Sequence, residues 1–151
     1  MPVTVKSITL WRKEVDNHPG VLAGTLEPFA TSGADLQVVM GYRFPGNERK
    51  AAIELYPVTG SASTKAARAG GLEASSIPTL LVEGDNKPGL GHSIAQALAD
   101  AGVNMAFLVA QVIGRRYSAV VGFDSAQDAK KAASLIRKAA TAGQRRAAKR
   151  R

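Results

Sequence analysis

The sequence predicts an α+β protein made of two copies of one βαββα(β) unit, each with an antiparallel sheet. Three observations lead to this prediction: a six-residue segment occurs twice, a helix-length apolar pattern follows each copy, and two strand-like runs follow each helix. A chain of 151 residues suffices for one ordinary domain or two very small ones. Units of about 70 residues bury only a modest share of their surface, so we expect them to associate.

The repeat is closest at a turn that precedes each predicted helix. Asp-Asn-His-Pro-Gly-Val at residues 16–21 returns as Asp-Asn-Lys-Pro-Gly-Leu at residues 85–90, an offset of 69. The same offset pairs Gly-Ala-Asp-Leu at 33–36 with Gly-Val-Asn-Met at 102–105, without a gap. Matched turns and matched helix lengths in the same order indicate a duplication.

Each copy is predicted to begin with a strand, at residues 4–14 and 79–82. Asp-Asn-x-Pro-Gly then signals a helix start, because Asp or Asn can cap free N–H groups and proline suits a first turn. Apolar residues follow at helical spacing, and Gly33 and Gly102 should end the two helices. Pro28 lies inside the first helix and predicts a bend or an early end there.

Two strands and an alanine-rich helix are predicted to complete each copy, at residues 36–43, 51–56 and 61–69, and at residues 105–113, 117–123 and 125–140. Residues 53–56 match 120–123 at an offset of 67, which predicts a turn two residues shorter in the second copy. The first copy has room for a last strand near residues 73–77, whereas the second has none. The second sheet therefore has an exposed edge or borrows a strand from another unit.

These elements predict a first unit at residues 1–77, a second at 78–142 and a basic C-terminal tail at 143–151. The net charge of +8 is mostly a property of this tail, because five of the 20 basic residues lie in the last seven positions. Such a tail can bind phosphates non-specifically, or can simply be a solvated end that aids solubility.

The composition argues against several classes of function. The absence of cysteine excludes disulfides, thiolate metal sites and cysteine nucleophiles. No apolar run has the length of a signal peptide or a membrane span, so we expect a cytoplasmic protein without membrane contact. The spacing of His18 and His92 suggests no shared metal site, and no catalytic set or glycine-rich phosphate loop is recognisable. We therefore expect no enzymatic activity, no metal and no cofactor.

The loop, the glycine spacing and the duplication together resemble the ACT domain over residues 4–140. The resemblance implies a ferredoxin-like fold for each unit and a role in sensing amino acids, since ACT domains regulate enzymes such as aspartate kinase and also occur in tandem in free-standing regulators. It implies an effector at an interface between units, against the loop that starts the first helix. The positions marked in this way are Asp16, Asn17, Pro19, Gly20, Val21, Leu22, Asp85, Asn86, Pro88, Gly89, Leu90 and Gly91.

The residue types at these positions suit an amino acid ligand independently of the resemblance. Free N–H groups at a helix start attract a carboxylate, and glycine permits close approach to the backbone. A nearby carboxylate or amide oxygen can accept a hydrogen bond from an ammonium group. The plain alternative is that each loop is only a good helix start. The loops also differ, since Gly91-His92 stands where the first copy has Leu22-Ala23.

The sequence therefore predicts a regulatory protein that binds a small amino acid at unit or subunit interfaces, forms a homodimer and signals to a protein partner through a changed interface. Two alternatives remain open at this point. One is a nucleic-acid-associated regulator that acts through the basic residues of 145–151, and the other is a purely structural dimerisation module.

Overall fold

The computed structural model describes residues 3–149, and for residues 143–148 it describes the backbone alone. The chain divides into two compact units. The inserted unit is Thr9–Ser76, and the terminal unit combines the residues up to Ile8 with those from Ile77 onward. This division differs from the expected units 1–77 and 78–142, because the first strand of the chain belongs with its second half.

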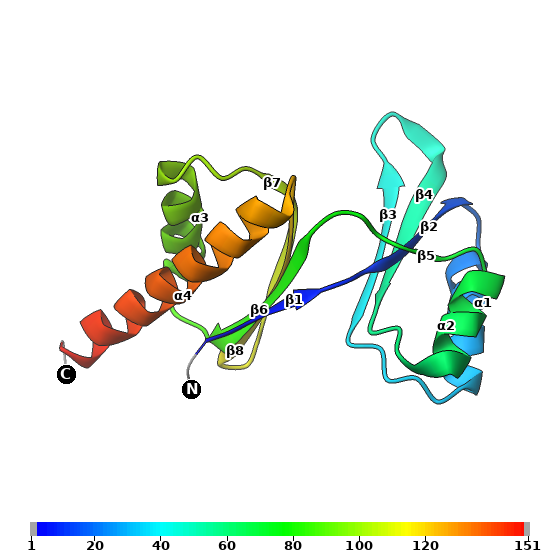
Figure 1. Ribbon diagram of the computed structural model, residues 1–151, viewed down its shortest axis with the longest axis horizontal. Helices are drawn as coiled ribbons and strands as arrows, with labels where there is room; N and C mark the ends of the chain where they lie inside the picture. Colours follow the sequence, from blue (N-terminus) through cyan, green and yellow to red (C-terminus); the bar gives the residue numbers. More distant parts are fainter. Residues whose placement is uncertain (1–2, 150–151) are drawn as a thin grey trace. The chain divides into compact units, whose positions relative to one another are not determined.

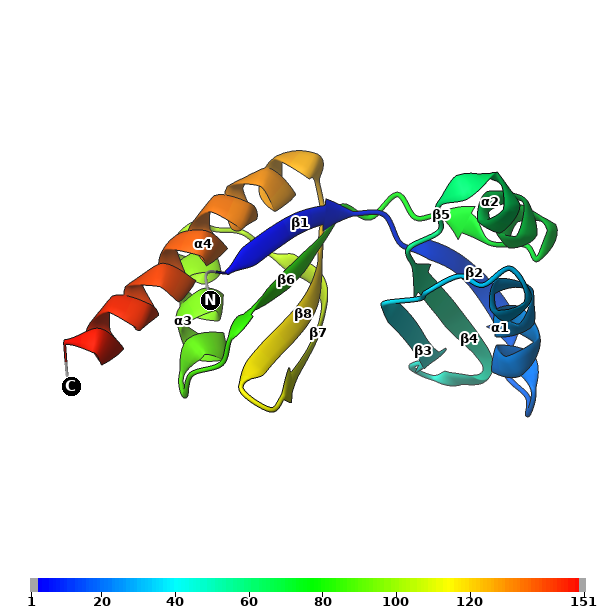
Figure 2. The same cartoon turned by 90° about the horizontal axis from the view of Figure 1, so that it is seen from below.

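The terminal unit is a four-stranded antiparallel sheet with two helices on one face (Figures 1 and 2). Its strand order is β1-β6-β8-β7. Leu80, Val121 and Phe123 from the sheet pack with Leu98 and Ile136 from the helices in one buried core. The elements are β1 (Thr4–Ile8), β6 (Thr79–Asp85), α3 (Leu90–Asp100), β7 (Met105–Ile113), β8 (Arg116–Phe123) and α4 (Ala126–Ala148).

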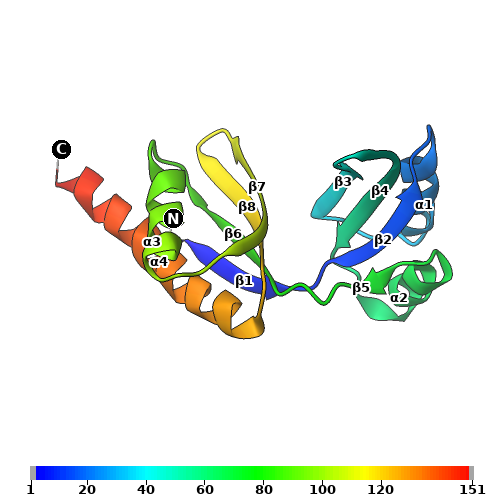
Figure 3. The same ribbon diagram turned by 90° about the horizontal axis from the view of Figure 1, so that it is seen from above.

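The inserted unit repeats this plan, again with both helices on one face of the sheet (Figure 3). Its strand order is β3-β4-β2-β5. Ile53 and Leu55 from the sheet pack with Phe29, Ala67 and Leu72. The elements are β2 (Trp11–Asp16), α1 (Val21–Thr31), β3 (Val38–Phe44), β4 (Asn47–Tyr56), α2 (Gly60–Ala69) and β5 (Glu73–Ala74).

The strand that the second repeat lacks is supplied by the start of the chain. β1 pairs antiparallel with β6, from Thr4 opposite Glu83 to Ile8 opposite Thr79. In the inserted unit β5 holds the same place beside β2. The expectation of one strand over residues 4–14 is therefore wrong, because this segment forms β1 and β2 in two different sheets. Of the two alternatives for the second sheet, a borrowed strand is the correct one.

The register of the hairpins corrects the predicted alignment of the repeats. Asp16 lies opposite Lys50 and Asp85 lies opposite Arg116, so β4 and β8 correspond at an offset of 66 rather than 67. A shift of one residue moves every side chain of a strand to the other face of its sheet. At the corrected offset Leu55 corresponds to Val121, and both lie in the cores under the helices. The second hairpin is therefore three residues shorter, because β3 and β7 correspond at an offset of 69.

Gly33 and Gly102 end their helices in the same way, as predicted. Both have positive φ, +73° and +69°. At the end of α1, Gly33 N–H donates to Ala30 and Ala34 N–H donates to Phe29, and two equivalent bonds end α3. These paired bonds define a Schellman motif.

Two predicted helix ends differ from the structure. Pro28 does not end α1, which continues to Thr31 with Phe29 buried in the core. The last helix, predicted for residues 125–140, continues to Ala148, so most of the expected tail has a helical backbone. Residues 150–151 of that tail lie outside the described residues.

The inserted sheet buries a carboxylate on the face away from its helices. Glu54 of β4 is 1% exposed and accepts a hydrogen bond of 3.1 Å from the Tyr42 hydroxyl. Its second carboxylate oxygen lies 3.9 Å from Arg12 Nε. At the offset of 66, the corresponding residue of the terminal sheet is Val120. The two sheets therefore differ in polarity at this position.

Candidate functional site

Both Pro-Gly segments form the same turn between strand and helix. Gly20 has φ +90° and Gly89 has φ +82°. Val21 N–H donates to His18 at 3.3 Å, and the equivalent bond in the second loop is 3.2 Å long. Proline followed by a glycine of positive φ is typical of a type II turn. The glycine is the N-cap in each case, and neither helix has a side-chain cap, so the predicted capping by Asp or Asn is wrong.

The absence of a side-chain cap leaves N–H groups open at both helix starts. At α3, Ser93 N–H donates to Gly89 at 3.0 Å, whereas the N–H groups of Gly91 and His92 have no partner among the described residues. α1 shows the same pattern at Leu22 and Ala23. Open N–H groups at the positive end of a helix dipole attract an anion such as a carboxylate.

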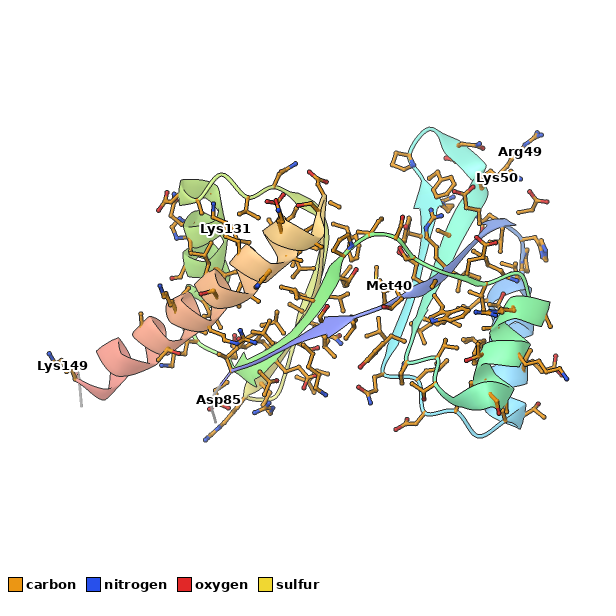
Figure 4. All side chains as sticks on the ribbon, viewed as in Figure 1. Met40, Arg49, Lys50, Asp85, Lys131 and Lys149 are labelled. Atoms are coloured by element: carbon orange, nitrogen blue, oxygen red, sulfur yellow. The ribbon has the colours of Figure 1, made fainter. Side chains whose placement is uncertain are left out.

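The two aspartates of the loops face cations on the neighbouring strand. Asp16 bonds Lys50 at 2.5 Å, and Asp85 lies 3.4 Å from Arg116. Figure 4 shows Lys50 on β4 and Asp85 at the end of β6. The hydrogen bond from Lys50 and its charge lower the pKa of Asp16. Both carboxylates therefore tie the loop to the sheet.

The two asparagines have the same backbone hydrogen bond but differ in the hydrogen bonds of their side chains. Each donates its backbone N–H to the facing hairpin at 2.8 Å, Asn17 to Arg49 and Asn86 to Arg115. The side-chain amide of Asn17 also donates to the Glu48 carbonyl at 3.2 Å. The Asn86 side chain has no hydrogen bond to any residue in the described part of the chain, so its amide is available to a ligand.

Each loop borders a hollow on the helix-covered side of its own sheet. The hollow of the terminal unit, which we call the terminal cavity, has a volume of about 310 Å³ and is lined by α3, β7, β8 and Ile136 of α4. The corresponding hollow of the inserted unit, the inserted groove, is lined at equivalent positions. Asn86, Gly91 and Val112 line the cavity where Asn17, Leu22 and Arg43 line the groove. The repeat therefore places one candidate site in each unit.

Tyr117 distinguishes the terminal cavity from its counterpart. It lines the cavity and lies across from Gly84, where an added Cβ would approach the Tyr117 ring and hydroxyl to 3.0–3.2 Å. The corresponding facing pair of the inserted unit is Val15 and Ala51. The Tyr117 hydroxyl is buried without a hydrogen-bond partner in the part of the chain described, and burial raises the pKa of Tyr117. A buried polar group of this kind calls for a partner.

The residues marked from the sequence fall into two groups. Asn86, Leu90 and Gly91 line the terminal cavity, and Asn17, Val21 and Leu22 line the inserted groove. The others form the turns or the ion pairs and do not line either hollow: Asp16, Pro19, Gly20, Asp85, Pro88 and Gly89.

Sequence reasoning did not select the strand residues Val112 and Tyr117, or Arg43 of the inserted unit. They lie outside the repeated loop and reach the hollows only through strand pairing. The replacement of facing Val15 and Ala51 by Gly84 and Tyr117 is a signal that the correct register would have revealed.

Residues 3–149 contain no group of three or more His, Asp or Glu side chains that could hold a metal ion. No helix in this described range is long and apolar enough to cross a membrane.

Comparison with known proteins supports the fold through structure. No family model and no curated protein matches the sequence. The regulatory subunit of aspartate kinase from Thermus thermophilus is 18% identical, with a TM-score of 0.62 over 92% of this chain and 97% of that one. The chain has a tandem ACT-like fold. Its two ferredoxin-like units confirm the fold class predicted from the repeat.

Two further structures share the tandem ACT-like fold. Protein BT0572 from Bacteroides thetaiotaomicron is 13% identical, with a TM-score of 0.69 over 85% of this chain and 87% of that protein. The aspartate kinase of Clostridium acetobutylicum is 14% identical, with a TM-score of 0.59 over 91% of this chain but only 34% of the kinase. The fold thus occurs both as a separate chain and as part of a larger enzyme.

Proposed function

We propose that this chain is a regulatory protein, not an enzyme, that binds a small amino acid beside a helix-start loop and signals its occupancy to a protein partner in the cytoplasm. The observation that carries the proposal is the pair of equivalent hollows, each bordered by two open N–H groups at a helix start. The shared fold with a regulatory subunit of aspartate kinase supports the regulatory role.

The terminal cavity offers complementary partners for both charged groups of an amino acid. The ligand carboxylate would accept hydrogen bonds from the N–H groups of Gly91 and His92, where the helix dipole also favours negative charge. The ligand ammonium would donate to the amide oxygen of Asn86, which has no protein partner among the described residues. Hydrogen bonds to charged groups are stronger than those between neutral ones.

We further propose a homodimer that pairs two copies through β7. This strand is the edge of its sheet, so its outer N–H and C=O groups have no strand partner in the described chain. It also exposes large apolar side chains: Leu108, Val109, Val112 and Ile113. Leu108 and Val112 line the terminal cavity as well, so a ligand there would alter the surface that a second copy contacts.

Thermal-shift measurements with each of the twenty amino acids test the proposal. A ligand that binds only the folded chain raises the melting temperature, because it adds about 2.7 kcal/mol to the free energy of unfolding at 100 times its Kd. We expect at least one amino acid to raise the Tm of the parent, and Asn86→Ala to weaken that effect without lowering the Tm of the free protein. If no amino acid shifts the Tm or binds in calorimetry, the chain is not an amino acid sensor.

A further inference from the structure

We propose that the two hollows are unequal sites: the terminal cavity takes an amino acid with a branched aliphatic or aromatic side chain, and the inserted groove does not take this ligand. The inference rests on the proposed function and specifies its ligand class. Four differences between corresponding positions of the two units carry it.

The first difference is room beside the helix start. Leu22 lines the inserted groove with a side chain that is 41% exposed, whereas its counterpart at the terminal cavity is Gly91. A Cβ added at Gly91 would meet no heavy atom within 4 Å. The space that a leucine side chain occupies in one unit is therefore vacant in the other, directly beside the open N–H groups.

The second difference is charge. The described lining of the terminal cavity includes no charged side chain, and its walls are formed by residues such as Leu90, Ile94 and Leu108. A charged ligand side chain would lose water there without gaining a counter-charge, whereas an apolar one gains from leaving water. In the inserted groove Arg43 stands where the cavity has Val112, which places a cation at the same point.

The third and fourth differences concern polar groups that lack partners. The Asn86 side-chain amide makes no hydrogen bond within the described residues, whereas Asn17 has its amide bonded to the Glu48 carbonyl. Tyr117 brings to the cavity lining a buried hydroxyl with no hydrogen-bond partner in the described chain, at the position of Ala51 in the inserted unit. The cavity is thus polar at one end, where Asn86, Gly91 and Tyr117 line it beside the helix start, and is lined by apolar side chains elsewhere. This combination matches an amino acid with an apolar side chain.

Calorimetry on the full chain tests the inference, with leucine, isoleucine and phenylalanine set against lysine and aspartate. The decisive variant is Gly91→Leu, which gives the terminal cavity the residue of the other unit. We expect the parent to bind one apolar amino acid per chain and Gly91→Leu to weaken this binding at least tenfold. The variant should fold, because position 91 lies in α3 with open space around it and leucine favours helix more than glycine does.

Two control variants separate filling of the cavity from a general change. Gly24→Leu adds the same side chain to α1 at another glycine with open space, and Leu22→Gly empties the corresponding position of the groove. Gly24→Leu should bind the apolar ligand as the parent does, Leu22→Gly should keep the parent's affinity at the terminal cavity, and the Tm of each free variant reports its folding.

The results separate this inference from the proposed function. Tighter binding of lysine or aspartate, equal binding of two apolar ligands per chain, or full affinity in a folded Gly91→Leu variant overturns the inference and leaves an amino acid sensor. Failure of every amino acid to bind the parent overturns the proposed function and the inference with it.

Discussion

The two helix-start turns have equivalent hydrogen bonds. The hollows beside them differ in the size and charge of the side chains that line them and in the polar groups that have no partner among the described residues. Pro19-Gly20 and Pro88-Gly89 impose the same backbone in both units, and the lengths of the equivalent bonds agree within 0.1 Å. The differences come from residues on other strands and on the helix face. The backbone that would hold a carboxylate is thus set locally, and the part that would choose between ligands is set by packing across the sheet.

The largest effect is expected for the facing pair Gly84 and Tyr117, which replaces Val15 and Ala51 of the inserted unit. Tyr117→Ala should lower the free energy of unfolding by about 3–5 kcal/mol, because it empties a buried aromatic position. Gly84→Val alone should cost about 1–3 kcal/mol, since a Cβ there already crowds the Tyr117 ring. The double variant recreates the Val15–Ala51 pair of the inserted unit.

We expect the double variant to be more stable than the sum of the single effects predicts, as measured by urea unfolding. If the two single effects on the free energy of unfolding simply add in the double variant, Gly84 and Tyr117 are not energetically coupled, and the difference between the two facing pairs does not affect stability.

A second experiment concerns the buried carboxylate of the inserted sheet. Arg12→Leu should lower the free energy of unfolding by about 3 kcal/mol, because it leaves Glu54 with only the Tyr42 hydroxyl beside it. Glu54→Val, which introduces the residue found at Val120 of the terminal sheet, should cost far less, since Arg12 is 27% exposed and can be hydrated. Equal losses in the two variants would contradict the assignment of Glu54 as the group that needs compensation.

The smallest expected effect concerns the ion pair at the inserted loop. Lys50 holds the pKa of Asp16 below its ordinary value of 3.8, so the pair stabilises the folded chain above that value and the contribution is lost as the pH falls through the lowered pKa. Both side chains are exposed, so the contribution is small. Asp16→Asn should therefore leave the Tm at pH 7 nearly unchanged and slightly flatten its fall between pH 5 and pH 2. A steeper fall in the variant would contradict this sign.

The parts of the fold that were predicted correctly are those determined by residues close together in the sequence. The Pro-Gly turns and the Schellman glycines follow from backbone preferences of a few neighbouring residues, and both recur at the offset of 69. The same local pattern marked Asn86, Leu90 and Gly91, which line the terminal cavity, and their part in ligand binding stays a prediction.

The errors concern non-local pairing. Residues 53–56 and 120–123 are both apolar enough to match at an offset of 67, and only strand pairing shows that the correct offset is 66. The pairing of β1 with β6 joins segments about half the chain apart, and no local pattern encodes it. The sequence did not predict Tyr117 as a site residue, because its position at the cavity depends on the register between β6 and β8.

The borrowed strand also has a consequence for the order of folding. Ile8 and its partner Thr79 are separated by the whole inserted unit, and closing such a long loop in an unfolded chain carries a large entropic cost. Within the inserted unit, however, Trp11 pairs with Ala74 and Ser75 N–H donates to Leu10 at 2.7 Å. Once that unit has folded, the segment that leads from Trp11 back to Ile8 and the segment that leads from Ala74 on to Thr79 start side by side. Early folding of the inserted unit therefore converts the slowest contact of the terminal sheet into a short-range one, and variants that weaken β2–β5 pairing should slow the folding of both units.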